Sequence, residues 1–116
     1  MNSIALTDHG VMFVAIDFYK ACKANGVKPI IGCEVYVAPR GRKDKEPKID
    51  EKYNHLILLA KNNDGYKNLA KLVSLGFTEG FYYKPRIDKE ILEKYHEGLI
   101  CLSACLAGEV SQAILN

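Results

Sequence analysis

The sequence predicts an α/β fold in which short apolar strands alternate with amphipathic helices. Apolar runs of strand length occupy residues 2–7, 28–37 and 55–60. Apolar side chains recur at helical spacing over residues 12–25 and 66–75. The chain has 116 residues, 48% of them hydrophobic, so a single domain with its own core is expected. It is short for a closed β/α barrel, which needs at least about 200 residues.

The N-terminal part of the chain reads as one β-α-β unit. The strand of residues 2–7 runs directly into a polar loop. The apolar positions of residues 12–25 fit a helix that is partly buried against a sheet, and Gly26 suits the left-handed conformation common at helix C-termini. Residues 28–37 then form a strand rich in β-branched and aromatic side chains.

A charged segment separates this unit from the next strand. Residues 39–52 carry hardly any apolar side chain, which predicts a solvated and mobile excursion. Residues 55–60 return as a buried strand that starts with His55. A strictly parallel barrel places site residues at the ends of its strands. This strand therefore either runs antiparallel to its neighbour or keeps His55 away from a site, and the spacing leaves both open.

The C-terminal half continues the alternation of helices and strands. Residues 62–65 have turn and N-cap chemistry ahead of the helix of residues 66–75. The remaining elements are a short helix to Tyr95 capped by Asp88, a strand over residues 98–103 and a helix start at Gly108. Because the chain begins at its first strand and stops without a closing signal, truncation at both ends is expected.

Composition and charge argue against several classes of protein. The formal net charge of +2 is weak, whereas a dedicated nucleic-acid binder usually carries a strong basic stripe. No run approaches the roughly 18 apolar residues of a membrane span, and residues 1–6 lack the regions of a signal peptide. The cysteines Cys22, Cys33, Cys101 and Cys105 do not form a dense secreted framework. Reduced thiols in a cytoplasmic protein are therefore expected.

Four side chains with metal-binding chemistry lie at or beside predicted strands, namely His9, Glu34, His55 and Cys105. Side chains at strand ends of an α/β fold converge on a common face, where ligands and catalytic groups gather. Two imidazoles, a carboxylate and a thiol suit zinc or another borderline divalent ion. Asp8, directly before His9, can fix the tautomer of a ligand imidazole. This convergence predicts a metal site and favours an enzyme.

Each of these four residues also has a simpler interpretation. His9 can be a satisfied histidine in a turn, and His55 a histidine at a strand end. Glu34 interrupts an apolar strand, where a buried carboxylate needs a cation or several hydrogen bonds. Alternatively, it faces solvent from an edge strand. Cys105 suits a thiolate ligand or a nucleophile near a helix start, although no paired base is evident nearby.

The other cysteines and histidine have structural interpretations. Cys22, Cys33 and Cys101 fall within helix or strand patterns and are predicted to be small core residues. His96 is predicted to lie in a surface turn.

A segment of aromatic and basic residues ends in Lys84 and Arg86. Together with Tyr82 and Tyr83, these residues could stack on bases and contact phosphates. The alternative is an aromatic packing patch, which the low net charge favours.

Five stretches of the sequence together resemble one known family. They are residues 4–10 (IALTDHG), 28–37 (KPIIGCEVYV), 55–62 (HLILLAKN), 80–88 (GFYYKPRID) and 98–109 (GLICLSACLAGE). In this order they resemble the PHP (polymerase and histidinol phosphatase) domain, in the version that bacterial replicative DNA polymerases carry. The resemblance covers nearly the whole chain apart from the charged segment.

The resemblance implies a distorted, TIM-like β/α barrel of seven strands with a multinuclear metal site. Residues 1–116 would then be a single partial PHP domain, truncated at both ends. His9, Glu34, His55 and Cys105 would be ligands of zinc or manganese. The opening His-x-His motif and the late Asp-x-His motif of the family are absent from the chain. Because each zinc ion is coordinated by about four ligands, these four side chains cannot hold several ions.

The resemblance also implies a place in chromosome replication. The parent protein would carry out DNA-directed DNA synthesis with magnesium in the bacterial cytoplasm, using polymerase residues that this chain does not contain. The PHP part would be phosphoesterase-like and linked to 3′-5′ proofreading. The alternative is a structural module that stabilises the polymerase or docks an exonuclease subunit. A free-standing histidinol-phosphatase-like enzyme fits poorly, because residues 66–69 and 82–86 match the polymerase version.

The expected partners follow from the same resemblance. They are the remainder of the polymerase and, through it, DNA, with no membrane. An open part of a barrel would also expose strand edges, so self-association is expected.

Overall fold

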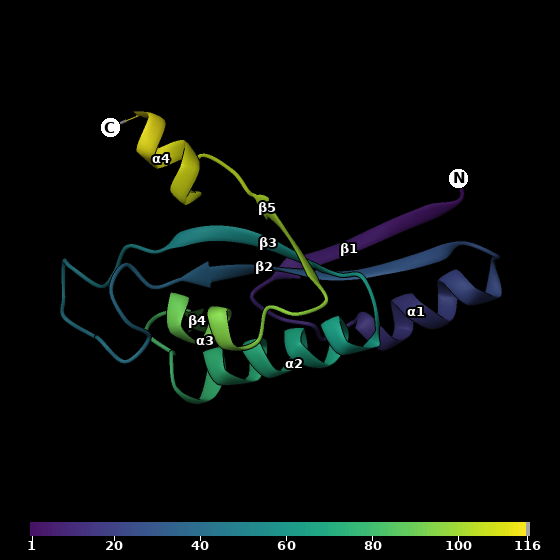
Figure 1. The fold of residues 1–116 in the computed structure, drawn as a ribbon, viewed down its shortest axis with the longest axis horizontal. Coiled ribbons are helices and arrows are strands. Elements are labelled where there is room, and N and C mark those ends of the chain that lie inside the picture. The colour runs from purple at the N-terminus through teal and green to yellow at the C-terminus, as the bar shows by residue number, and fades with distance from the viewer. Residues whose placement is uncertain (116) are drawn as a thin grey trace.

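The computed structural model describes residues 1–115, which form one mixed sheet with four helices (Figure 1). The strands are β1 (Ser3–His9), β2 (Lys28–Val37), β3 (Asn54–Ala60), β4 (Arg86–Ile87) and β5 (Leu99–Ser103). The helices are α1 (Ala15–Ala24), α2 (Asn63–Thr78), α3 (Lys89–Lys94) and α4 (Glu109–Leu115). The α/β class is thus confirmed. Within the described residues the sheet is open and does not close into a barrel.

The order of the strands explains why segments from both halves of the chain meet at the same end of the sheet. The path runs β1-β2-β3-β5, with β1 and β2 parallel, as the predicted β-α-β unit requires. Strand β3 is antiparallel to both β2 and β5. The start of β3 therefore lies beside the end of β2, where His55 pairs with Tyr36. This answers the question that the spacing left open, in favour of the antiparallel arrangement.

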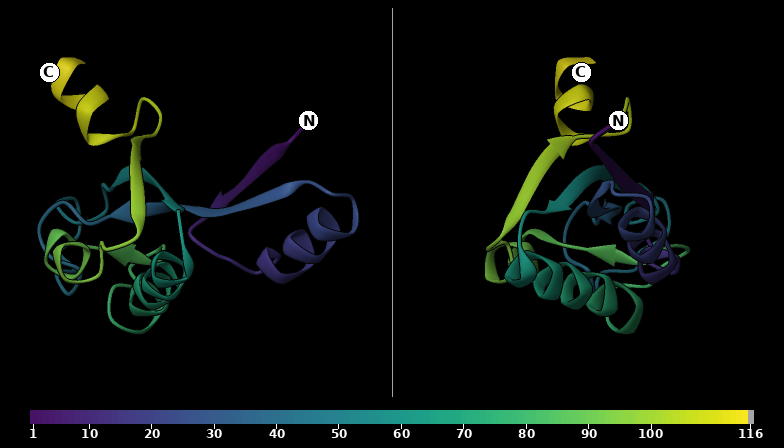
Figure 2. Two further views of the ribbon diagram at one scale, coloured as in Figure 1. Left: turned by 45° about the vertical axis from the view of Figure 1, so that its right-hand side comes forward. Right: turned by 90° about the vertical axis from the view of Figure 1, so that its right-hand side faces the viewer.

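One face of the sheet forms the core. Side chains alternate between the two faces of a strand, and the buried side chains of β2 on the core face are Cys33, Val35 and Val37. They pack with Leu58 of β3 and with α2 and α3, through Leu69, Leu72 and Ile91. Figure 2 shows α2 and α3 on this side of the sheet and α4 on the other. The alternate positions of β2, including Glu34 and Tyr36, therefore face away from the core.

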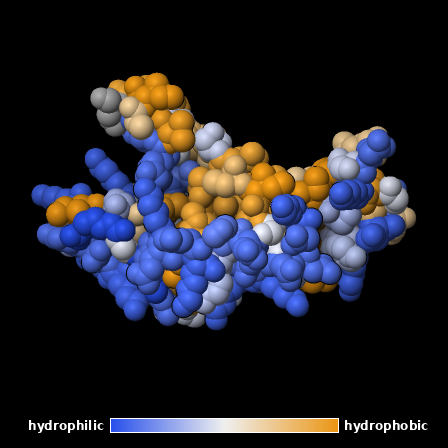
Figure 3. Space-filling view, in the orientation of Figure 1, coloured by the Kyte–Doolittle hydropathy of each residue, from blue (hydrophilic) through white to orange (hydrophobic). Residues whose placement is uncertain are grey.

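The opposite face carries apolar side chains that no helix covers. Leu102 pairs with Ile57, and Ile100 with Leu59, so all four share this face. Ile100 and Leu102 are 46% and 44% exposed. Figure 3 shows a hydrophobic area over the strands, between α4 and the N-terminal part of the chain. None of the helices within residues 1–115 is long and apolar enough to cross a membrane.

Capping decides where the helices begin. The Asn62 side chain accepts a 2.8 Å hydrogen bond from the Gly65 N–H, so α2 starts earlier than the apolar pattern predicted. Asp88 caps α3 as predicted, by accepting a 3.1 Å bond from the Ile91 N–H. Helix α1 has no side-chain cap and starts three residues later than predicted, at Ala15. An N-cap side chain satisfies backbone donors that are otherwise free, which explains the difference between α2 and α1.

Two of the three cysteines assigned to the core are buried. Cys22, within α1, is buried and Cys33 is fully inaccessible, as predicted. The prediction for Cys101 is wrong, because β5 is the last strand of the sheet and Cys101 is exposed there. His96 lies exposed just after α3, in agreement with the surface turn that the sequence predicted.

Most residues of the charged segment of residues 39–52 are exposed, as its composition predicted, but Arg42 and Asp50 are buried. The segment is nevertheless packed on the domain. It folds over Arg86, which is fully inaccessible to solvent. The Arg86 guanidinium donates hydrogen bonds to four backbone carbonyls, those of Gly80 and Arg42 at 2.8 Å, Asp44 at 3.0 Å and Asp50 at 3.3 Å. A buried Arg86 cannot contact nucleic acid, so that prediction is wrong. Lys84 is exposed, with its ammonium group 5.5 Å from the centre of the Tyr36 ring.

Ion pairs fix the same segment to the rest of the domain. Arg42 pairs with Asp88 at 3.0 Å and with Glu79 at 2.8 Å. The guanidinium of Arg40 pairs with Asp50, which is completely buried. Buried charges are tolerated in proteins only when they are paired and hydrogen-bonded. These pairs therefore explain how a segment with so many charges can pack against α3 and β4.

Acid should weaken this packing. The Arg40 guanidinium lowers the pKa of Asp50, against the opposing effect of burial. Burial alone would raise the pKa of Asp88, but the N–H groups of Arg42 and Ile91 and the Arg42 guanidinium lower it below its usual range. A carboxyl whose pKa is lower in the folded state stabilises the fold above its unfolded pKa, about 3.9, and this stability is lost as the pH falls below that value.

We therefore expect the free energy of unfolding to drop steeply below about pH 4. Asp88→Asn should flatten this dependence, whereas the exposed Asp17→Asn should leave it unchanged. Urea unfolding followed by circular dichroism between neutral and acidic pH measures both effects. Equal acid sensitivity in wild type and Asp88→Asn would contradict this explanation.

Candidate metal centre

Three strands bring the first three candidate ligands together. Glu34 lies near the end of β2, inside the sheet, with β1 on one side and β3 on the other. His9 is the last residue of β1 and is the register partner of Glu34. His55 pairs with Tyr36, two residues beyond Glu34 and on the same face. Register alone therefore places Glu34 between two imidazoles, on the face of the sheet opposite the core.

The Glu34 carboxylate contacts both histidines. Its Oε2 lies 2.7 Å from Nδ1 of His9, and its Oε1 lies 2.9 Å from Nδ1 of His55. The Glu34 side chain is only 12% exposed, against 21% for His55 and 69% for His9. The alternative that Glu34 faces solvent from an edge strand is therefore wrong. The site is open to solvent on the His9 side.

Cys105 reaches the same place through a backbone connection after β5. The N–H of His55 donates to the carbonyl of Ala107 at 3.1 Å, and His55 forms an isolated bridge with Gly108. A 2.8 Å hydrogen bond from the Gly108 N–H to the Cys105 carbonyl closes the turn. As a result, the Cys105 sulfur lies 3.2 Å from Nδ1 of His55.

Asp8 has a different contact from the one predicted. Its carboxylate accepts a 2.8 Å hydrogen bond from the backbone N–H of His9, rather than from the imidazole. The chain then turns at Gly10, whose φ of 70° is in the left-handed region that favours glycine. The Gly10 N–H donates to the Glu34 carbonyl at 2.8 Å. Asp8 and Gly10 thus shape the turn that presents His9.

The donor atoms fit a single divalent ion. The ligand atoms of Glu34, His55 and Cys105 lie within 4.8 Å of one another. That spacing approximates the distance between ligands across an ion with bonds of about 2.0–2.3 Å. His9 is not in this group but joins it through the second oxygen of Glu34. Oxygen, nitrogen and sulfur donors together suit zinc.

Two tyrosines near the site were not predicted as part of it. Tyr36 and Tyr53 pack against the His55 ring. The signal was present in the sequence, because Tyr36 follows Glu34 by two residues and Tyr53 precedes His55 by two. Residues two apart in a strand lie on the same face, so this alternation could have identified Tyr36, whereas Tyr53 precedes the start of β3 at Asn54.

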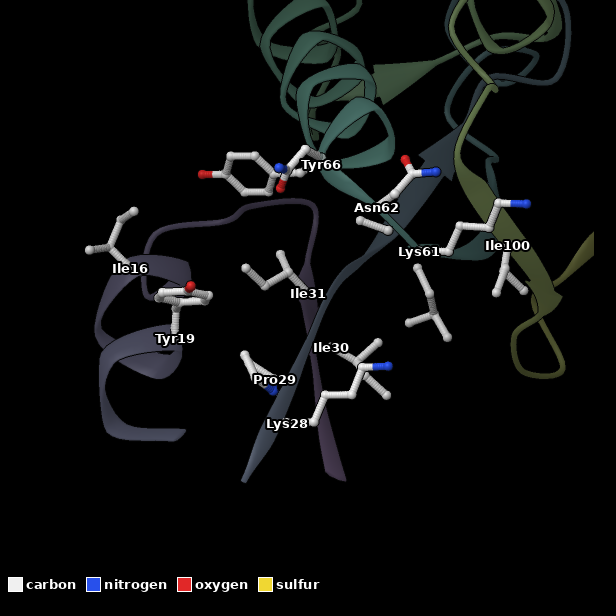
Figure 4. Close-up of a pocket in the computed structure, with 13 residues that line it drawn as sticks. Ile16, Tyr19, Lys28, Pro29, Ile30, Ile31, Lys61, Asn62, Tyr66 and Ile100 are labelled. Carbon is white, nitrogen blue, oxygen red and sulfur yellow. The ribbon is translucent and has the colours of Figure 1, made fainter. Parts of the chain in front are cut away.

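An open groove lies away from the metal centre. Its volume is about 530 Å³. It lies between α1 and the first half of β2, with Ile16, Tyr19 and Ile30 among its lining residues, and Ile100 closes its far side (Figure 4). Glu34, His55 and Cys105 do not line it. Because these ligands do not line the groove, it is not part of the candidate metal centre.

Thiol accessibility provides a test of the geometry. Cys101 and Cys105 are exposed, whereas Cys22 and Cys33 are buried, and burial raises the pKa of Cys33 to about 12. Iodoacetamide reacts with accessible thiolates, so it should modify Cys101 and Cys105 but neither buried cysteine. Zinc should protect Cys105 and leave Cys101 reactive, as measured by mass spectrometry of the peptides. Equal protection of both thiols, or of neither, would count against a site at Cys105.

Comparison with known proteins identifies the family of the chain. The family model of the PHP domain matches residues 1–116, and the chain belongs to the PHP domain family. Its closely similar relatives include the DNA polymerase III subunit alpha of Chlamydia muridarum, with 60% identity over 115 residues, 98% of this chain and 9% of the relative. The resemblance predicted from the motifs is confirmed.

Other organisms provide similar relatives with the same name. The DNA polymerase III subunit alpha of Treponema pallidum is 56% identical over 116 residues, which cover 99% of this chain and 10% of the relative. That of Thermus aquaticus is 53% identical over 116 residues, 98% of this chain and 10% of the relative. The chain thus spans about a tenth of the length of these curated relatives.

Proposed function

We propose that this chain is a metal-binding module of a DNA polymerase III alpha subunit, in which His9, Glu34, His55 and Cys105 hold one divalent ion. Zinc or manganese is the proposed metal. One observation carries the proposal: a nearly buried carboxylate lies between two imidazoles, with a thiol beside one of them. A carboxylate in this position needs a cation or several hydrogen bonds, and a purely structural sheet does not require the other three side chains.

Each of the four residues would have its own role at such a site. Glu34 would hold both imidazoles in place through its two oxygens, and Cys105 would add a thiolate. His9, whose side chain is 69% exposed, lies on a side from which a phosphoester could approach. A bound divalent metal supplies Lewis-acid activation of a phosphoryl oxygen.

The wider function follows from the names of the relatives. The parent protein would carry out DNA-directed DNA synthesis in the bacterial cytoplasm, with magnesium at polymerase residues outside this chain. Its partners would be the remainder of the alpha subunit and, through it, DNA. The sheet would be part of a distorted seven-stranded barrel, with residues 1–116 as part of the PHP domain. The module itself would be phosphoesterase-like and linked to proofreading.

A second candidate function is a structural or interaction module without catalysis. The uncovered strand face that carries Ile100 and Leu102 favours it, because exposed apolar patches often mark contact surfaces. In that case the face would pack on the rest of the alpha subunit, dock a proofreading exonuclease subunit, or associate with a second copy. Sedimentation of the purified chain across a range of concentrations tests self-association.

Metal content of the purified chain, determined by plasma mass spectrometry, tests the first proposal. We expect about one zinc or manganese per chain, since four donors serve one tetrahedral ion. The ion should be lost in both Cys105→Ala and His9→Ala. A metal-free wild type, under conditions in which the chain is folded, would favour the structural module.

The isolated chain is expected to have neither polymerase nor substantial phosphatase activity. Primer extension requires polymerase residues that are outside this chain, and one ion cannot reproduce a multinuclear site. Primer extension by the purified chain would overturn the first expectation. Strong metal-dependent hydrolysis of a simple phosphoester that Glu34→Ala abolishes would overturn the second.

A further inference from the structure

The imidazole of His55 packs against two tyrosine rings, and the three rings form one cluster. The Tyr53 ring lies nearly parallel to it, with ring centres 5.8 Å apart and an angle of 15° between the planes. The Tyr36 ring meets it edge-on, at 5.2 Å and 72°. The two tyrosines also contact each other, with centres 4.9 Å apart. These separations fall in the range at which aromatic pairs attract one another.

The Tyr36 ring, which contacts His55, is itself held in place. Tyr36 is 6% exposed and lies in the middle strand of the sheet. A methyl group at Gly10 would come within 2.8 Å of the Tyr36 ring, so the turn after β1 packs directly against this ring. The ammonium group of Lys84 lies over the same ring. The neighbouring strands, the turn at Gly10 and the Lys84 ammonium group thus hold the Tyr36 ring in position beside His55.

This packing fixes the plane of the His55 ring, and the contacts of Nδ1 select the nitrogen that faces the other ligands. Nδ1 lies 2.9 Å from the Glu34 carboxylate and 3.2 Å from the Cys105 sulfur. A partial rotation of the ring about its bond to Cβ would disrupt the parallel stack with Tyr53 and the edge contact with Tyr36. A half turn keeps the ring plane but carries Nδ1 away from Glu34 and Cys105.

We propose that Tyr53 and Tyr36 are positioning residues, which hold the His55 imidazole with Nδ1 directed at Glu34 and Cys105. This inference rests on the proposed metal site. Mutation of residues that orient a metal ligand without binding the metal typically changes metal affinity by about 10–100-fold. Loss of the Tyr53 ring removes one of the two aromatic contacts, so we expect zinc binding to weaken by about 10-fold.

Three variants of the complete 116-residue chain test the proposal: Tyr53→Leu, Tyr53→Phe and Tyr19→Leu. Tyr53→Phe keeps the ring and removes only the hydroxyl, and Tyr19→Leu removes an exposed ring on α1, away from the site. Zinc affinity is measured by competition with a chromophoric chelator. We expect weaker binding in Tyr53→Leu alone. Unchanged affinity in Tyr53→Leu, or an equal loss in Tyr53→Phe, would overturn the proposal.

A second measurement separates this proposal from the metal site itself. If the wild-type chain takes up neither zinc nor manganese, the proposed function fails, and nuclear magnetic resonance of the metal-free chain decides the orientation. A single His55 rotamer with contacts to both tyrosine rings, retained in Tyr53→Phe, supports the positioning role. A rotationally averaged His55 without those contacts overturns it. This readout requires only wild type and Tyr53→Phe, so it stands even where Tyr53→Leu does not fold.

Discussion

Arg86→Ala is expected to lower the free energy of unfolding by about 3–5 kcal/mol, the cost typical of removing one partner from a buried polar network. Four carbonyls accept hydrogen bonds from this guanidinium, and the side chain is fully buried. Each carbonyl left without a donor costs about 1–3 kcal/mol unless water enters the space. The loss is large against a total stability of about 5–15 kcal/mol for a typical domain.

Urea denaturation provides the measurement for Arg86. Arg86→Lys keeps the charge but not the planar array of donors, so it should recover only part of the loss. Lys67→Ala changes an exposed cation on α2 and should shift stability by no more than about 0.5 kcal/mol. A small effect of Arg86→Ala, comparable to that of Lys67→Ala, would show that the charged segment folds without the hydrogen bonds of Arg86.

Glu34→Gln is expected to weaken zinc binding by about 100-fold or more, since outer-shell changes alone reach about 10–100-fold. The substitution preserves the size of the side chain and removes its charge. Both histidines lose the carboxylate that contacts their Nδ1 atoms. The amide can accept hydrogen bonds through its oxygen only, so it cannot hold two imidazoles in the same way.

The affinity of Glu34→Gln is compared with that of Glu93→Gln, an exposed carboxylate on α3 that contacts none of the candidate ligands. Calorimetric titration with zinc gives both values. Retention of wild-type affinity in Glu34→Gln would mean that any bound zinc lies elsewhere. A loss in both variants would indicate a general effect of charge.

Much of the fold could be predicted because its signals are local. The apolar pattern and the helix caps at Asn62 and Asp88 involve neighbouring residues, and the β-α-β unit followed from them. The charged segment could not be predicted in this way. Arg42 pairs with Asp88, 46 residues further along the chain, and Arg86 lies beneath residues that precede it by 36–44 positions. Composition shows the charges but not the partners that neutralise them.

The same distinction applies to the candidate site. Glu34 stands out within its own strand, because a carboxylate interrupts an apolar run. The convergence of His55 with Cys105, 50 residues apart, depended on the antiparallel direction of β3, which the spacing left open. The exposure of Cys101 depended on β5 being an edge strand. Pairing order is a property of the whole sheet, so it cannot be read from any one strand.

X-ray absorption at the zinc edge of the zinc-loaded chain tests the central claim most directly. The geometry predicts one sulfur neighbour at about 2.3 Å and nitrogen or oxygen neighbours at about 2.0–2.2 Å. In Cys105→Ala the sulfur neighbour should disappear. A wild-type zinc ion with only nitrogen and oxygen neighbours, or a sulfur neighbour that persists in Cys105→Ala, would contradict a centre built from His9, Glu34, His55 and Cys105.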